Sequence, residues 1–381
     1  MLSCYQVIDL SDKTGWLAGK TLADLGADVV KIEVPDADLS DPDWRAFNIG
    51  KRLLRLDVTQ DAGRRELDKM IGRADVLIET ASPSCAGDWL EAGRLAALNP
   101  GLVHVSITPF GHGGPRANWR GSDIEVMAAS GAMSLIGEPD GTPLRISVPQ
   151  SGLWAGAQAA VGVLIALTHR ASGDRGDGGG RGQHVDVSAQ ASVLAALAHA
   201  PTFFDLLGTT PSRVGSHISG RSVEGAVYRA FWQCRDGHIN FVIYGGPAGR
   251  RTNKALVAWM REVKADLGVL ADLDWDVFDP KLATQEEVDR IEQPIAEFLK
   301  VLTKAEFLDG AFAREMLGYP VSTVADISAD PQLAARDFWQ DVEMPDGGRA
   351  RHCGAFYLRD GVRPSLTVHA ALEPDEVEKA G

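Results

Sequence analysis

The stretch "YQVIDLSDKTGWLAGKTLADLGADVVKIE" (residues 5–33) decides the fold. Its first residues are apolar and β-prone, which predicts a strand over residues 5–10. Helical spacing follows over residues 15–25, and Gly26 is a typical residue to end a helix. With a second strand over residues 28–33, the stretch predicts a strand–helix–strand unit of a parallel sheet.

The same alternation continues along the first half of the chain. Further strands are expected over residues 52–58, 74–80, 102–110 and 184–188, with a helix over 61–71. This order predicts the α/β fold class, with a doubly wound sheet. In such sheets the ligand-binding groups lie on loops at the carboxyl ends of the strands.

After Pro201 the pattern changes. Two strands around Asp236-Gly237 form a strong hairpin signal, and long helical segments follow. We therefore expect three parts: the first part of a large α/β domain over residues 1–205, a small α+β domain over 206–320, and a return segment of the large domain over 321–381.

The net charge and the spacing of the cysteines argue against some classes of function. The 381 residues carry a net charge of −14, which argues against a nucleic-acid partner because phosphate neutralisation needs a surplus of Lys and Arg. An anionic ligand must therefore meet a local basic patch. The four cysteines are far apart in sequence, without metal-ligand spacing, so we expect reduced thiols in a cytoplasmic protein and no metal. The apolar run over residues 155–167 is short for a bilayer span, so we expect a core helix and no membrane.

Several blocks, in order along the chain, resemble the family III CoA-transferases, which include formyl-CoA transferase, carnitine CoA-transferase and α-methylacyl-CoA racemase. The blocks are residues 21–33, 48–58, 74–80, 103–115, 181–194 and 319–339. The resemblance implies a Rossmann-like large domain, a smaller α+β domain and an interlinked, ring-like dimer. It implies coenzyme A or acyl-CoA as substrate and a small carboxylic acid as acceptor. In active members an aspartate attacks the thioester to form a mixed anhydride, then an enzyme-bound CoA thioester.

The resemblance also implies which residues contact CoA. The family's basic turn survives as Asn48, Lys51 and Arg52, where it faces CoA phosphates. The alternative is a solvated Lys-Arg pair beside a strand. The acidic stretch over residues 36–45 should repel phosphate, although Arg45 is a substitute cation. The segment "TASPS" (residues 80–84) lacks the Asn and Arg that relatives carry there.

At the family's nucleophile turn, this chain reads "VPQSGLWAG" (residues 148–156). Counting from the helix that follows places the catalytic aspartate at Ser151 or Gly152, or at Gln150 with a shift of one. None of these side chains can form an anhydride. We expect Ser151 to be the N-cap of the helix.

The acid/base pair of the racemase branch is also missing. Ser122 stands where that branch has a histidine, and the aspartate at the nucleophile turn is absent. Asp123, which follows Ser122, is a weak candidate for a catalytic residue and is more typical of a structural position.

Three hypotheses follow. The first is that the chain is the catalytically silent subunit of a two-component transferase, partnered with a paralogous, Asp-bearing chain. Its segment over residues 9–20 resembles the non-nucleophilic subunit of systems such as succinyl-CoA:benzylsuccinate CoA-transferase. The second is an active homodimeric transferase or racemase with a displaced acid such as Asp123, Glu125 or Glu224. The third is a non-enzymatic acyl-CoA-binding protein.

Overall fold

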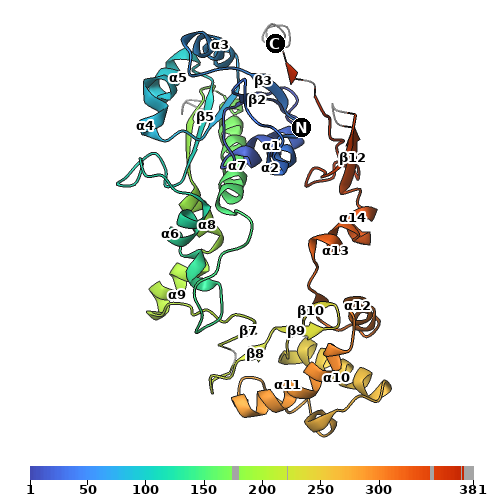
Figure 1. Cartoon of the computed structure of the whole chain (residues 1–381). Helices are drawn as coiled ribbons and strands as arrows, with labels where there is room; N and C mark the ends of the chain where they lie inside the picture. The colour runs from blue at the N-terminus through green and yellow to red at the C-terminus, as the bar shows by residue number, and fades with distance from the viewer. Residues whose placement is uncertain (174–179, 221, 344–346, 370, 373–381) are drawn as a thin grey trace. The chain divides into compact units, whose positions relative to one another are not determined.

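The computed structural model describes residues 1–173, 180–220, 222–343, 347–369 and 371–372. Residues 174–179 and 373–381 of the expected large domain lie outside this range. The chain divides into two compact units, coloured along the chain in Figure 1. The large unit contains Met1–Ser134, Arg145–Pro211 and Pro331–Gly381; the small unit contains Leu135–Leu144 and Ser212–Asp330.

A seven-stranded parallel sheet forms the centre of the large unit, in the order β14-β3-β2-β1-β4-β5-β6. The α/β class predicted from the sequence is confirmed. The strand order reverses between β1 and β4, and ligands of doubly wound sheets bind beside such a reversal. The strands are β1 (Gln6–Asp9), β2 (Asp28–Glu33), β3 (Arg52–Arg55), β4 (Val76–Glu79), β5 (Val103–Thr108), β6 (His184–Ser188) and β14 (Ala371–Leu372).

Helices cover both faces of this sheet because the strand side chains alternate between two apolar cores. Val7 and Val105 pack in one core with residues of α1 and α7, and Ile8 and Leu77 pack in the other with residues of α3 and α5. The α-helices of the unit are α1 (Trp16–Asp24), α2 (Pro42–Asn48), α3 (Asp61–Ile71), α4 (Pro83–Ala86), α5 (Ala92–Leu98), α6 (Asp123–Ala129), α7 (Ser151–Ala171), α8 (Ala189–Ala196), α9 (His199–Leu207) and α14 (Pro331–Ala335). Short 3₁₀ turns are η1 (Gly87–Leu90) and η2 (Ala132–Leu135), and β12 (Trp339–Glu343) pairs antiparallel with β13 (Arg349–Cys353).

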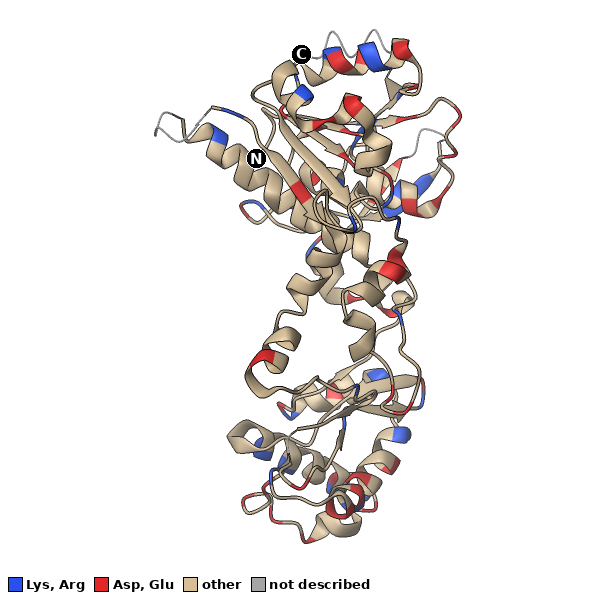
Figure 2. Ribbon diagram, turned by 90° about the vertical axis from the view of Figure 1, so that its left-hand side faces the viewer, with Lys and Arg blue, Asp and Glu red and all other residues tan. Residues whose placement is uncertain are grey.

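Helix α7 is the longest helix of the large unit. It carries no Lys, Arg, Asp or Glu before Arg170, so its ribbon is tan until close to its C-terminal end in Figure 2. Among the described residues it is the one helix long and apolar enough to cross a membrane by length and composition alone. Its buried side packs against α1, β5 and β6, as a core helix does.

The small unit combines a three-stranded antiparallel sheet with helices. The predicted hairpin is confirmed, because β9 (Phe231–Cys234) pairs with β10 (Gly237–Asn240). Its core is rich in aromatic side chains, including Trp232, Trp259 and Phe307. The remaining elements are β7 (His217–Ile218), β8 (Tyr228–Arg229), β11 (Tyr319–Pro320), α10 (Gly246–Glu262), η3 (Gly268–Ala271), α11 (Gln285–Lys300), α12 (Lys304–Ala313) and α13 (Val324–Ser328).

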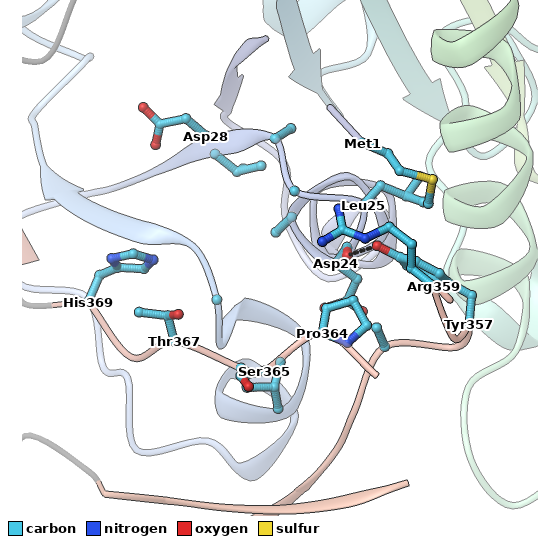
Figure 3. A pocket seen from close by; sticks show the side chains of 17 residues that line it. Met1, Asp24, Leu25, Asp28, Tyr357, Arg359, Pro364, Ser365, Thr367 and His369 are labelled. Atoms are coloured by element: carbon cyan, nitrogen blue, oxygen red, sulfur yellow. Dashed lines mark hydrogen bonds between the residues drawn. The ribbon is translucent and has the colours of Figure 1, made fainter. Parts of the chain in front are cut away.

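The C-terminal segment returns to the large unit, where β14 pairs with β3. Between this segment, the end of α1 and the start of β2 lies a pocket of about 370 Å³ (Figure 3). The Tyr357 hydroxyl donates a hydrogen bond to the Asp24 carbonyl oxygen across 3.0 Å at this place. Since Asp28 begins β2, the pocket lies at the amino end of that strand, away from the carboxyl ends where a doubly wound sheet binds its ligand.

Candidate functional site

The loop between β1 and α1 lies next to two segments of the candidate site, one after β4 and one at the start of α7. Its Asp12 N–H donates to the Thr80 hydroxyl, 3.0 Å away, immediately after β4. On another side, the backbone of Thr14 approaches Gly152 in the first turn of α7. The loop therefore lies at the carboxyl ends of β1 and β4, between the segment over residues 80–84 and the predicted nucleophile turn.

A carboxylate from a different element caps α7. Asp123 Oδ1 accepts hydrogen bonds from the Gln150 N–H (2.7 Å), the Ser151 N–H (2.8 Å) and the Ser151 hydroxyl (2.9 Å). The prediction that Ser151 is the N-cap is wrong: Gln150 occupies that position and its side chain makes no capping bond. The Gln150 amide instead donates to the carbonyl oxygens of Val148 and Pro149. A capping carboxylate satisfies N–H groups that the helix leaves unpaired and favours the positive end of its dipole.

The predicted nucleophile turn is thus ordered by Asp123 without a nucleophile of its own. Ser151 is 4% exposed, and its hydroxyl donates a hydrogen bond to the capping carboxylate. Gly152 has no side chain, and a Cβ atom built there would lie 3.0 Å from Thr14 Cα and 3.2 Å from the Thr14 carbonyl oxygen. Contacts this close require the backbone of the β1–α1 loop to move.

Lys51 lies inside the protein. Its Nζ donates to Asp9 Oδ2 (2.7 Å), Asn48 Oδ1 (2.8 Å) and the Trp16 carbonyl oxygen (2.9 Å). Burial lowers the pKa of Lys51 to about 8, although the neighbouring Asp9 acts in the opposite direction. Burial also acts to raise the pKa of Asp9, but the charges of Lys51 and Lys31 outweigh it and the net pKa is lowered. The two groups therefore form an ion pair at neutral pH.

The other predicted CoA contacts lie in different surroundings. Asn48 is buried beside Lys51, with its amide donating to the Trp44 carbonyl oxygen across 2.9 Å. Arg52 forms an ion pair with Asp28. Arg45 on α2 is exposed, and its guanidinium forms no ion pair with an acidic group among the described residues. The CoA-binding roles of these four residues stay predictions.

Two cations that the sequence reasoning overlooked lie on the loop after β5. Arg116 and Arg120 are exposed and neither forms an ion pair within the described part of the chain. The Arg116 guanidinium stacks 5.2 Å from the Trp119 ring. The Ser84 N–H donates to Asn118 Oδ1 across 3.0 Å, which attaches this loop to the segment over residues 80–84. The sequence signal was two arginines flanking a tryptophan within a glycine-rich loop.

Where the chain is described, no group of three or more His, Cys, Asp or Glu side chains is arranged to hold a metal ion. The four cysteines are free thiols. The site has an ordered turn and exposed cations, and exposed cations suit an anionic ligand.

Comparison with known proteins identifies the family to which the chain belongs. A model of the family described as CoA-transferase family III matches residues 2–365. The chain is 32% identical over 361 residues to succinyl-CoA:(R)-benzylsuccinate CoA-transferase subunit BbsE of Thauera aromatica, a match covering 89% of this chain and 83% of that protein. It is 28% identical over 370 residues to a succinate–glutarate CoA-transferase of Agrobacterium fabrum, covering 91% and 86% of the two chains.

The fold is also similar to that of a solved structure. The crystal structure of a CAIB/BAIF family protein from Brucella suis superposes with a TM-score of 0.80 at 25% sequence identity. The match covers 99% of this chain and 97% of that one. The similarity therefore includes both units of the chain.

Proposed function

The chain belongs to CoA-transferase family III, and from this we propose that it is the catalytically silent subunit of a two-component CoA-transferase. The complex would move CoA from an acyl-CoA to a carboxylic acid. The relative from Thauera aromatica is itself described as a subunit, which supports a partnered arrangement here. The Asp-bearing partner would be a paralogous chain of the same family.

One observation carries the proposal: the nucleophile turn has no carboxylate, and a loop occupies the space beside it. The backbone of Thr14 lies so close to Gly152 that no side chain fits without a loop shift. The nearby carboxylate, Asp123, receives three hydrogen bonds on one oxygen and holds the start of α7. An anhydride requires a free carboxylate that can reach the thioester carbonyl, so we assign that step to the partner.

Exposed apolar surface supports a partner chain. Helix α9 buries none of its residues, and it exposes 63% of both Phe204 and Leu207. On α7, Val161 and Ile165 are 50% and 63% exposed on one side of the helix. A nine-residue helix is marginal in water without tertiary contacts, and apolar patches on soluble chains commonly mark interfaces. The interlinked dimer implied by the family resemblance would cover such helices.

We further propose that the large unit contributes binding energy for CoA. Arg116 and Arg120, with Arg45 as a third cation, are the exposed groups that phosphates can reach, whereas the Lys51 ammonium is held by Asp9. Trp119 is 56% exposed beside Arg116 and offers a face on which an adenine ring can stack. These loops lie at the carboxyl ends of parallel strands, where nucleotides bind in doubly wound folds.

Succinyl-CoA is the first donor to test, because both relatives described above are named for succinyl or succinate transfer. A cytoplasmic location suits free thiols and a CoA thioester substrate. The test is to purify the chain alone, the Asp-bearing paralogue alone, and the two together, and to measure CoA transfer from succinyl-CoA to dicarboxylic acids. Transfer by the mixture and not by this chain supports the proposal. Robust transfer by this chain alone refutes it, and CoA binding without transfer in any mixture favours a binding protein.

A further inference from the structure

Ionisable side chains gather on one face of the large sheet at its β6 edge. Glu79 ends β4, His104 and Ser106 lie on β5, and His184 lies beside them on β6. The His104 and His184 rings stack with centroids 4.7 Å apart, and the Ser106 hydroxyl lies 3.3 Å and 2.9 Å from their Nε2 atoms. His112, on the glycine-rich loop after β5, completes the cluster, with its ring edge-on to His184 at 5.6 Å.

Two buried atoms in this cluster face each other without hydrogen-bond partners. Glu79 is 1% exposed, and its Oε1 accepts no hydrogen bond, while Oε2 accepts one from the Ala81 N–H. His112 Nε2 is also buried and unpartnered, and it lies 4.0 Å from Glu79 Oε1. His104 Nε2 on β5 lies nearer to the same oxygen, 3.4 Å away, but His104 belongs to the sheet and not to the loop. A buried polar atom without a hydrogen-bond partner is unfavourable. A proton on His112 Nε2 would attract the ring toward Glu79, and a charge-assisted hydrogen bond would satisfy both atoms once they are closer than the present 4.0 Å.

This contact would act on the position of the loop. The His112 N–H already donates to both carboxylate oxygens of Asp186, each 3.0 Å away, and the Gly111 N–H donates to the Thr108 hydroxyl across 2.9 Å. Beyond His112 the chain has two exposed glycines, Gly113 and Gly114, and then reaches Arg116 and Arg120. His112 is therefore the last residue before Arg116 that attaches the loop to the sheet, and it does so through its backbone N–H.

We infer that His112 and Glu79 position the glycine-rich loop after β5 through a proton-dependent contact, and so set how firmly Arg116 and Arg120 are held for an anionic ligand. The inference rests on the proposed function for its ligand, which is CoA. The titratable groups around His112 are Glu79 on β4, His104 on β5, and His184 and Asp186 on β6, and Glu91 before α5 interacts with His104 and His184. Burial, His104 and His112 lower the pKa of His184, so His184 does not compete well for the proton.

The direct test is amide hydrogen exchange of residues 111–120 in the full chain at pH 6 and pH 8, expressed as protection factors. An imidazole is protonated to a greater extent at pH 6 than at pH 8, so we expect about tenfold greater protection at pH 6. H112Q and E79Q should show equal protection at both pH values. H112K, which supplies a permanent cation to Glu79, should be protected at both. H199Q, at an exposed histidine on α9, is the matched control and should behave like the unmodified chain.

Equal protection of the unmodified chain at both pH values would overturn the inference, as would a pH dependence that persists in H112Q. If E79Q fails to fold, H112Q and H112K still decide, because their change lies on the loop.

A second measurement, the Kd for CoA at pH 6 and pH 8, separates this inference from the proposed function. The Kd of the unmodified chain at each pH is divided by the Kd of H112K at the same pH. This ratio removes the effect on binding of the titration of the CoA phosphates. Loop protection that changes with pH without any CoA binding refutes the proposed CoA contact only; CoA binding without that change refutes the positioning role only.

Discussion

At the scale of single residues, substitutions of Asp123 distinguish a structural role of this side chain from a catalytic one. Its Oδ1 accepts three hydrogen bonds from Gln150 and Ser151 at the start of α7. We expect D123A to lower the free energy of unfolding by about 1–2 kcal/mol, the usual cost of a lost N-cap, and D123N to lose less because its amide oxygen still accepts. Chemical denaturation measures this. Transfer activity of the complex per folded molecule should not change in D123N; a large loss there would make Asp123 catalytic.

Substitution of Gly152 tests how closely the β1–α1 loop packs against the first turn of α7. A Cβ atom there would lie 3.0 Å from Thr14 Cα, and this close contact destabilises the folded state. The steric cost outweighs the roughly 1 kcal/mol by which Ala is more favourable than Gly in a helix. We expect G152A to be destabilised by about 1 kcal/mol net, and G152D by more, without transfer activity in the lone chain. The exposed Q158A on the same helix is the control and should be neutral or slightly stabilising. A stabilised G152A would show that the loop yields freely.

At the scale of elements, α11 contains a carboxyl group that should make the small unit sensitive to pH. Burial raises the pKa of Glu292 to about 7, even though Oε1 accepts the Arg229 N–H at 2.7 Å and the Arg229 Nε lies 3.8 Å from Oε2. The folded state then holds a proton that the unfolded state releases near pH 4.5. Stability from this group is therefore complete below about pH 4.5 and is lost as the pH rises through 7.

E292Q keeps an oxygen acceptor and removes the charge. We expect it to resemble the unmodified chain at pH 5 and to be more stable by about 2 kcal/mol at pH 8. Urea denaturation followed by the fluorescence of Trp232 and Trp259, both in the small-unit core, measures the difference. A variant that is equally destabilised at both pH values would mean that Glu292 is ionised in the folded state throughout this range.

Element positions were largely predictable from the sequence, because strand and helix periodicities are local. Residues 28–33, 61–71 and 184–188 match β2, α3 and β6 to the residue. The site was less predictable, because its contacts join distant parts of the chain. Lys51 reads as a surface cation but is 5% exposed, since Asp9 at the end of β1 supplies its counter-charge. No local pattern reports that pairing, or the capping of α7 by Asp123.

At the scale of the whole molecule, α9 is the helix that we expect a partner chain to cover. We expect F204D to abolish co-purification with the Asp-bearing paralogue while the circular dichroism of the isolated chain is unchanged, because Phe204 is 63% exposed. T202D adds the same charge to the same helix without removing an apolar group, and should retain the partner. Equal retention by the two variants would place the interface elsewhere.

The central claim is that the covalent chemistry belongs to the partner. The most direct measurement mixes the two chains with succinyl-CoA, traps acyl intermediates with hydroxylamine and locates the modified side chain by mass spectrometry. We predict a hydroxamate on the aspartate of the paralogous chain and none on this chain, at Asp123 or elsewhere. A hydroxamate on any carboxylate of this chain, or turnover by this chain alone, would contradict the account.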